Sequence, residues 1–207
     1  MRIPLSWLRE YAPLPEGASA EYLMETLVRV GLEEEDVHRP SDDISGPVVV
    51  GQVLTMEPEE HSNGKTVNWC TVRVVPEGEE QTLTGEGIDP SGIQGIVCGA
   101  HNFAPGDKVV VTLPGAVLPG NFAIAARKTY GHVSAGMIAS VRELGIGDDH
   151  DGILVLSTLG LDPEIGSDAL ALLGLDDEAA EINVTPDRGY AFSIRGVARE
   201  YCHAVNE

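Results

Sequence analysis

The chain contains the run Val48-Val49-Val50-Gly51-Gln52-Val53-Leu54, whose β-branched side chains predict a β-strand. A second run, from Val67 to Val74, is also rich in β-branched residues and alternates in part between apolar and polar. Clusters of Gly, Pro and Asn separate these runs from three further strand candidates, at 93–98, 108–113 and 122–130. Five short strands so close together predict a small closed barrel rather than a βαβ sheet.

The segments on either side of this barrel contain the predicted helices. Ser19 is a suitable N-cap, apolar residues recur at helical spacing from Leu23 to Val30, and Gly31 follows where a left-handed C-cap belongs. The acidic segment 33–45 ends in Pro, Ser and Asp and is interpreted as a linker. After the barrel, strand candidates at 153–156 and 181–184 lie before and after a helix candidate at 168–173.

These later apolar segments are too few to form a core alone, so we expect them to pack on the N-terminal helix. This predicts a split α+β domain made of residues 1–41 and 151–190, with a barrel domain of residues 42–150 inserted into it. Residues 191–207 are then expected to begin the next domain or a linker.

The charge balance limits how the chain can bind nucleic acid. Its 207 residues include 13 Lys and Arg against 33 Asp and Glu, which gives a formal net charge of −20. A body this acidic cannot hold a polyanion through a general electrostatic footprint, so any such contact must come from a small local patch. Aromatic residues make up only 5%, which is few for a protein that stacks many unpaired bases.

Composition also bears on the compartment. The sequence contains no apolar run long enough to cross a membrane. Arg9 and Glu10 interrupt the first residues early, so a signal peptide is not expected. Cys70, Cys98 and Cys202 are odd in number and widely spaced, which favours reduced thiols and a cytoplasmic protein.

Signatures of common enzymes are missing: the sequence has no Walker loop, no G-x-G-x-x-G, no nucleophile elbow and no H-E-x-x-H. The cluster Asp148-Asp149-His150-Asp151-Gly152 could attract a metal ion, but it lacks the alternating oxygen spacing of a calcium loop, and a polar turn is favoured. Residues His61, Asn63 and Lys65 could position a phosphate or simply hold a turn.

The most specific signal is a combination of four runs in a fixed order. They are Ile96-Val97-Cys98-Gly99-Ala100-His101-Asn102, Pro114-Gly115-Ala116-Val117-Leu118-Pro119, Gly131-His132-Val133-Ser134-Ala135-Gly136-Met137 and Arg142-Glu143-Leu144-Gly145. With these runs the chain resembles the tRNA-binding barrel shared by bacterial phenylalanyl-tRNA synthetase β chains and a few small tRNA-binding proteins. The flanking runs resemble the N-terminal part of the β chains: Arg2-Ile3-Pro4-Leu5-Ser6-Trp7-Leu8, Asp149-His150-Asp151-Gly152-Ile153-Leu154, Val184-Thr185-Pro186 and Arg195-Gly196-Val197-Ala198-Arg199-Glu200.

The resemblance implies an α+β fold with a five-stranded OB-type β-barrel inserted into a split small α+β domain. It implies an accessory, tRNA-binding role in a phenylalanine–tRNA ligase, whose α subunit carries most of the aminoacylation chemistry in an α₂β₂ tetramer. ATP and magnesium are implied for that holoenzyme only. No cofactor, metal, DNA or membrane is expected to bind this chain, and we expect it to be catalytically inert alone, because the family's residues for editing and for magnesium lie further along the subunit.

Three predicted RNA contacts fall in the run that matches the family's Ser-x-Gly-Met. The Ser134 hydroxyl would bond a phosphate or ribose, Gly136 would permit close approach, and Met137 would lie against a base or ribose. Alternatively, Gly136 and Met137 make a barrel corner and fill a gap in the core.

The other predicted contacts are polar or cationic. Asn102 would cap its turn or reach RNA. A stretch of cations without an acid before Glu143 forms the best local patch, although a solvated strand face is the competing interpretation. The remaining candidates are Asn63, Lys65, Arg127, Lys128 and Arg142, and His132 belongs to the same cationic stretch.

The chain departs from the family pattern at two places. The run His61-Ser62-Asn63-Gly64-Lys65-Thr66-Val67 stands where the family has His-Pro-Asn-Ala-Asp-Lys-Leu, so the family lysine falls on Thr66 and Lys65 takes the place of an acid. Near the end, Asp187 and Tyr190 stand where the family commonly has Asn and Asp. Two other functions compete: a docking module with little RNA contact, favoured by the charge of −20, and a stand-alone tRNA-binding protein, which the flanking runs disfavour.

Overall fold

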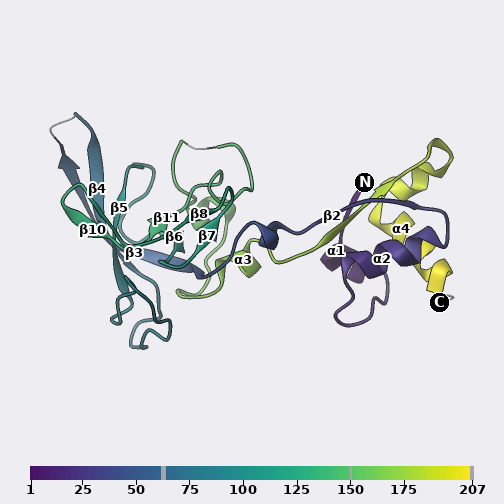
Figure 1. Ribbon diagram of the computed structural model, residues 1–207, viewed down its shortest axis with the longest axis horizontal. Helices are drawn as coiled ribbons and strands as arrows, with labels where there is room; N and C mark the ends of the chain where they lie inside the picture. The colour runs from purple at the N-terminus through teal and green to yellow at the C-terminus, as the bar shows by residue number, and fades with distance from the viewer. Residues whose placement is uncertain (62–63, 150, 206–207) are drawn as a thin grey trace. The chain divides into compact units, whose positions relative to one another are not determined.

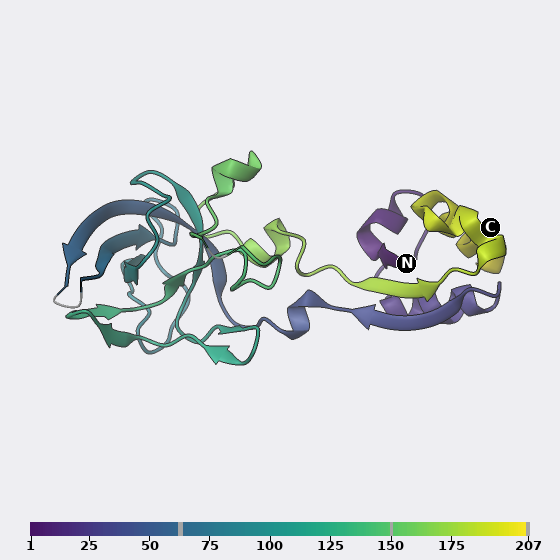
Figure 2. The same ribbon diagram turned by 90° about the horizontal axis from the view of Figure 1, so that it is seen from above.

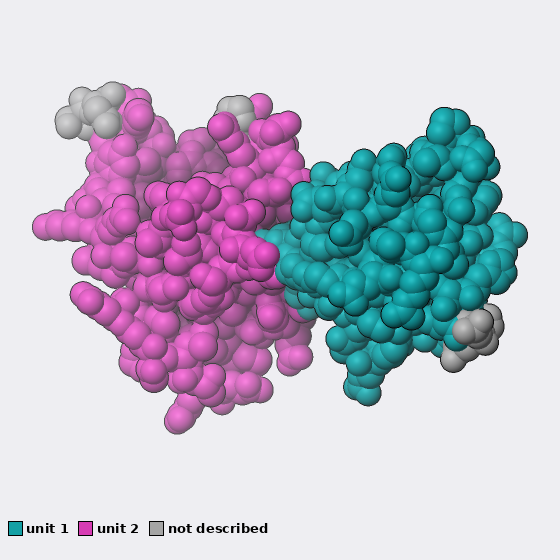
Figure 3. Space-filling model, turned by 45° about the vertical axis from the view of Figure 1, so that its right-hand side comes forward, with its two compact units in different colours: residues 1–40, 175–207 teal, residues 41–174 magenta. Residues whose placement is uncertain are grey.

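The computed structural model describes residues 1–61, 64–149 and 151–205. It divides into two compact units (Figure 3). Residues 1–40 and 175–207 form the terminal unit, and residues 41–174 form the barrel unit. Each unit has a buried apolar cluster of its own.

Five antiparallel strands form the main sheet of the barrel unit (Figure 1). In the order β11-β6-β3-β4-β5 they are β11 (Met137–Ile138), β6 (Lys108–Thr112), β3 (Val48–Glu60), β4 (Thr66–Arg73) and β5 (Ile93–Cys98). Strand β3 pairs with both β4 and β6, and a register shift between Val53 and Thr55 marks an irregularity that favours bending. Figure 2 shows β3 as a curved blue ribbon. The sheet therefore curls into a half-barrel, which is consistent with an OB-like fold.

The core of this sheet follows the alternation seen in the sequence. Val53, Val72, Ile96 and Val111 are fully buried and belong to one apolar cluster. Gly51 lies among them, and a Cβ there would come within 2.5 Å of a methyl group of Val111, so the close packing of β3 on its neighbours requires glycine.

The prediction of one strand at 122–130 is wrong. The segment instead forms β8 (Phe122–Ala123) and β9 (Arg127–Thr129), which pair with β7 (Val117–Leu118) and β10 (His132–Ser134). Tyr130 and Gly131, with φ of 52° and 91°, make the two-residue turn between β9 and β10. Because the chain reverses at this turn, residues 122–130 cannot form one continuous strand. The fifth strand of the main sheet is β11 instead.

Residues 151–174 belong to the barrel unit and not, as predicted from the sequence, to the split domain. The reason is burial: Ile153 and Val155 pack in the barrel cluster, and Val155 forms an isolated bridge with Val109 in place of a strand. The short elements that follow are η2 (Leu156–Leu159) and α3 (Ala169–Leu172), whose N-cap Asp168 forms a bridge with Val49.

The terminal unit combines a three-stranded sheet, in the order β1-β12-β2, with helices. Its elements are β1 (Arg2–Pro4), α1 (Leu5–Arg9), α2 (Ala20–Val28), β2 (Glu33–His38), β12 (Ala179–Asn183), η3 (Pro186–Phe192) and α4 (Ile194–Val205), and η1 (Pro40–Asp42) spans the unit boundary in sequence. The predicted cap is confirmed, because the Ser19 hydroxyl accepts the Tyr22 N–H at 3.3 Å. Leu23 and Leu27 of α2 are fully buried against the rest of this core.

Two expectations for this unit are overturned. The segment predicted as an acidic linker contains β2, which pairs with β12 at the edge of the sheet; four exposed acidic residues are compatible with a strand there, because charge protects a free edge. Residues 191–207 do not begin another unit, since helix α4 buries Val197 and Tyr201, one helical turn apart, in the terminal core.

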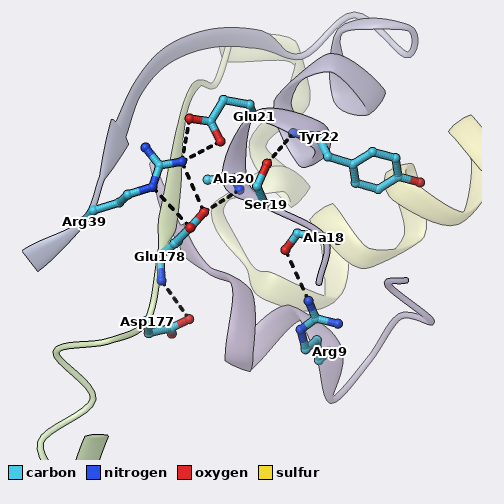
Figure 4. A network of polar contacts seen from close by, with 9 residues as sticks. All are labelled: Arg9, Ala18, Ser19, Ala20, Glu21, Tyr22, Arg39, Asp177 and Glu178. Atoms are coloured by element: carbon cyan, nitrogen blue, oxygen red, sulfur yellow. Dashed lines mark hydrogen bonds and ion pairs between the residues drawn. The ribbon is translucent and has the colours of Figure 1, made fainter. Parts of the chain in front are cut away.

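An ion-pair network joins helix α2 to the residue that follows β2 and the residue that precedes β12 (Figure 4). Arg39 lies between Glu21 of α2 and Glu178, with an Nη2–Oε1 distance of 2.5 Å to Glu21 and an Nε–Oε1 distance of 3.2 Å to Glu178. Glu178 also accepts the backbone N–H of Ala20 at the start of α2 at 2.8 Å. The hydrogen bond from Arg39 lowers the pKa of the Glu21 carboxyl to about 2.

This pKa shift predicts an acid-sensitive contribution to stability. The pKa of Glu21 is depressed from an ordinary value of 4.5, so its contribution is complete above about pH 4.5 and is lost as the pH falls towards 2. We expect Glu21→Gln to flatten that part of the stability profile, measured by urea unfolding from pH 2 to 6. Glu25→Gln, on the same helix, is the charge-matched control; if it flattens the profile equally, the Arg39 contact is not the cause.

Candidate RNA-binding site

A cleft of about 940 Å³ lies in the barrel unit where the family-like runs meet. Its walls come from the turn after β5, from β11 and from the segments on both sides of residue 150. They include Val97, Cys98, Gly99, Ala100, His101, Asn102, Pro119, Met137, Ile138, Ser140, Arg142, Glu143, Asp151, Gly152 and Ile153. Three of the predicted contacts, Asn102, Met137 and Arg142, thus share one cleft.

Asn102 fastens two walls of this cleft together. Its Oδ1 accepts the Ile153 N–H at 3.0 Å, and its Nδ2 donates to the Ile153 carbonyl at 2.9 Å. Gly152 permits this approach, because a Cβ there would lie 2.5 Å from the Asn102 amide. The side chain of Asn102 therefore replaces a strand partner for Ile153, which gives it a structural role in shaping the cleft.

Ser134 and Gly136 close the half-barrel against β5. The buried Ser134 hydroxyl accepts the Val97 N–H at 3.0 Å and donates to the Gly136 carbonyl at 3.2 Å, and the Ala135 N–H donates to the Gly95 carbonyl. Gly136 has φ of 123°, and a Cβ on it would lie 2.8 Å from the Thr112 carbonyl oxygen. These contacts give both residues a structural role, while their contact with RNA stays a prediction.

The predicted cationic stretch is divided in space. Arg127 and Lys128 are exposed on β9, where Arg127 donates to the Ala123 carbonyl and lies over the Phe122 ring. Arg142 lines the cleft instead, and Met137 lines both the cleft and a smaller pocket that includes Arg127. The cations therefore offer two separate contact points, Arg142 in the cleft and the pair Arg127 and Lys128 on β9.

His132, the fourth member of the stretch, is engaged by other residues. Its ring stacks on Trp69 with centroids 4.2 Å apart, and its Nε2 lies 2.9 Å from a Glu59 oxygen. The hairpin of β9 and β10 thereby covers part of the β4–β5 face that OB folds commonly use for oligonucleotides. The Trp69 ring also packs closely on Gly95, because a Cβ there would come within 2.3 Å of the ring.

A capped turn forms the floor next to Arg142. The Ser140 N–H donates to Glu143 Oε2 at 2.7 Å, and the Glu143 N–H donates to the Ser140 hydroxyl at 3.2 Å. This is the reciprocal arrangement of a capping box, which the Ser-x-x-Glu spacing signals. Gly145, with φ of 69°, ends the turn. The Glu143 carboxylate is thus engaged locally.

Residues 48–160 match the family described as putative tRNA binding domain. The chain belongs to this family.

Curated relatives carry a more specific name. The "Phenylalanine--tRNA ligase beta subunit" of Leifsonia xyli subsp. xyli is 65% identical over 99% of this chain and 24% of its own length. The proteins of the same name from Bifidobacterium longum and Thermobifida fusca are 51% and 53% identical over 98% and 99% of this chain, each over 23% of its own length. The chain therefore spans about a quarter of the curated relatives that it matches.

The remaining predicted contacts of this tRNA-binding-domain chain lie between β3 and β4. Asn63 lies outside the described residues. Lys65 is exposed, and its carbonyl accepts the N–H of His61 across the loop. In OB folds this loop and the one between the fourth and fifth strands border the binding face, and here the second of these loops includes Arg127 and Lys128.

Sequence reasoning missed two residues of the tRNA-binding domain. His101 lines the cleft, and Asn68 of β4 is fully buried behind it. The available signals were the position of His101 inside the Cys98–Asn102 run and the phase of Asn68, which falls in step with the inward-facing Cys70 and Val72.

The described residues were also compared with the requirements of a metal site, a membrane span and a reactive thiol. Within 1–61, 64–149 and 151–205, no group of three acidic, histidine or cysteine side chains could hold a metal ion, and no helix is long and apolar enough to cross a membrane. The cysteines are free, and burial raises the pKa of the Cys70 thiol to about 12. A thiol held protonated in this way is a poor nucleophile.

Proposed function

We propose that this chain is the tRNA-binding, N-terminal part of a phenylalanyl-tRNA synthetase β chain and supports the ATP-dependent attachment of phenylalanine to its tRNA. The observation that carries the proposal is the family match over residues 48–160, within which Asn102, Met137 and Arg142 meet in one cleft. The names of the relatives support the assignment to the ligase.

In this proposal the chain contributes binding and the α subunit contributes the chemistry, within an α₂β₂ tetramer in the cytoplasm. ATP and magnesium then belong to the holoenzyme. The chain alone is expected to give no ATP–pyrophosphate exchange with phenylalanine above a heat-treated control.

Titration of the intact chain with fluorescently labelled phenylalanine tRNA at two salt concentrations tests the binding role. With −20 charges overall, we expect weak binding, with Kd of about 10⁻⁴ to 10⁻⁵ M near physiological salt. Two or three phosphate contacts give a logarithmic salt slope of about 2 to 3. A chain that is folded and shows no saturable binding at low salt would overturn the proposal.

That negative result would favour the second candidate, a docking module within the synthetase. Two observations support this candidate: the strongly acidic charge, and the cover that His132 and its hairpin place over Trp69 on the β4–β5 face. A docking module would bind the rest of the ligase with no tRNA present, which pull-down with the purified α subunit and the remainder of the β chain measures.

We also propose that the barrel unit is an insertion into a terminal unit able to fold without it. The terminal unit has its own core, with Leu23, Ile182 and Tyr201 contributed from both sides of the barrel unit in sequence. Replacing residues 41–174 with a short Gly/Ser linker is expected to leave a cooperatively unfolding protein, because closing a surface loop costs little entropy. An amide NMR spectrum without dispersion would count against the insertion.

A further inference from the structure

His101 stands on the wall of the cleft with one ring nitrogen already engaged. The side chain is exposed and lines the cleft, and its Nδ1 lies 3.2 Å from Nδ2 of the buried Asn68. The other ring nitrogen, Nε2, has no hydrogen-bond partner among the described residues. What Nε2 can offer a ligand depends on where the imidazole proton is.

Asn68 determines the position of that proton. Its Nδ2 lies 2.6 Å from the Ala100 carbonyl oxygen, which can only accept, so the amide nitrogen and not the amide oxygen must face it. The second N–H of the same amide then points to His101 Nδ1, which accepts. In the neutral ring the proton is therefore on Nε2, and His101 presents an N–H donor.

This arrangement of Asn68 lowers the stability of the folded chain. Asn68 is fully buried, and its Oδ1 has no hydrogen-bond partner in the described part of the chain. An unpaired buried acceptor disfavours folding. Asn68 offsets part of this cost through its two described contacts, one to the Ala100 carbonyl in the turn after β5 and one that orients the His101 ring.

The rest of the cleft suits an uncharged, flat group with acceptor atoms. Met137, Ile138 and Pro119 supply apolar surface, and Arg142 supplies a cation for a neighbouring phosphate. Two carboxylates also line the cleft, Asp151 and Glu143, of which Glu143 accepts the Ser140 N–H; their charge disfavours an anionic group at the centre of the cleft. A volume of about 940 Å³ falls in the range that holds small organic ligands. Unpaired RNA bases are recognised by such combinations of packing and edge hydrogen bonds.

We propose that the cleft takes one unpaired nucleotide of the tRNA, and that His101 selects it by donating Nε2–H to an acceptor on the base edge. Asn68 is a positioning residue that fixes the tautomer. This inference rests on the proposed function and assigns the part of the RNA that the cleft reads.

The test compares variants of the intact chain in titrations with labelled phenylalanine tRNA. His101→Ala is expected to weaken binding about two- to tenfold, the value of one hydrogen bond, with an unchanged salt slope because no phosphate contact is lost. His101→Gln, which keeps a side-chain N–H donor, should recover part of the loss. His203→Ala, at an exposed histidine of the terminal unit, is the matched control and should bind as the unaltered chain does.

The positioning role of Asn68 has a separate readout. Imidazole ¹⁵N NMR of the chain should show the Nε2–H tautomer of His101, and Asn68→Leu should produce a mixture of tautomers. The double variant Asn68→Leu/His101→Ala should lose less affinity than the two single variants together, because the effect of Asn68 on the base contact passes through His101. Losses that simply add would show that Asn68 does not position His101.

The outcomes separate the inference from the proposed function. If tRNA binds but His101→Ala changes neither affinity nor slope, the base-reading role is wrong and the binding role stands. An Nδ1–H tautomer in the unaltered chain also overturns the inference. If the folded chain binds no tRNA at all, both the inference and the proposed function are wrong.

Discussion

Replacing Asn102 with alanine is expected to lower the free energy of unfolding of the barrel unit by about 2–4 kcal/mol. The substitution leaves the N–H and the carbonyl of buried Ile153 without partners, and each unpaired group costs about 1–3 kcal/mol. The cleft loses the link between two of its walls, so tRNA affinity should fall as well. Urea unfolding followed by circular dichroism measures the first effect.

Two variants make the result specific. Asn102→Asp keeps an acceptor for the Ile153 N–H but sets a carboxylate against the Ile153 carbonyl, so it should also destabilise the unit. Gln52→Ala removes one exposed hydrogen bond from a side-chain amide to the Gly106 carbonyl and should cost less than about 1 kcal/mol. A loss for Asn102→Ala as small as that of Gln52→Ala would show that the link does not hold the cleft.

Replacing Arg127 and Lys128 together with alanine is expected to reduce the salt slope of tRNA binding by about 2. Both side chains are exposed on β9, and each phosphate contact releases about one counterion. The affinity should fall by the same factor for cognate and non-cognate tRNA, since phosphates carry no sequence information. Fluorescence titration across a salt series, with cognate and non-cognate tRNA, measures both quantities.

The matched control removes the same two charges elsewhere. Arg195 and Arg199 lie exposed on α4 of the terminal unit, over the rings of Tyr11 and Tyr190. Their double replacement with alanine should leave the slope unchanged. Met137→Ala, by contrast, should weaken binding with the slope intact. If all three variants bind tRNA equally well and fold normally, neither the exposed cations of β9 nor Met137 contact RNA, and the docking module is the better account.

Elements with local signals were predicted well from the sequence: the Ser19 cap begins α2, and the Val48–Leu54 run lies in β3. Predictions based on charge or on spacing were wrong where a partner far along the chain determines the conformation. The acidic residues of β2 were interpreted as a linker because their pairing partner is β12, in which Ala179 lies opposite His38. A partner so far along the chain is beyond the reach of any local pattern.

The same limit applies to the candidate site. The family-like runs contained Asn102, Met137 and Arg142, and composition required any RNA contact to be local. The sequence could not show that the Asn102 amide is occupied by Ile153, 51 residues away, or that Ser134 closes the barrel against Val97. Both side chains are polar and resemble ligand-binding groups until their partners are known.

By itself, then, the sequence determined the capped helix, the strand runs, the family and the limit that −20 charges set on RNA binding. These depend on backbone preferences, apolar periodicity and net charge, which can be obtained from short stretches of sequence or from composition. Only the tertiary structure decided that β11 completes the sheet, that α4 joins the terminal core and that Asn68 orients His101. Those outcomes depend on hydrogen bonds and burial between residues far apart in the chain, which form only when the whole unit packs.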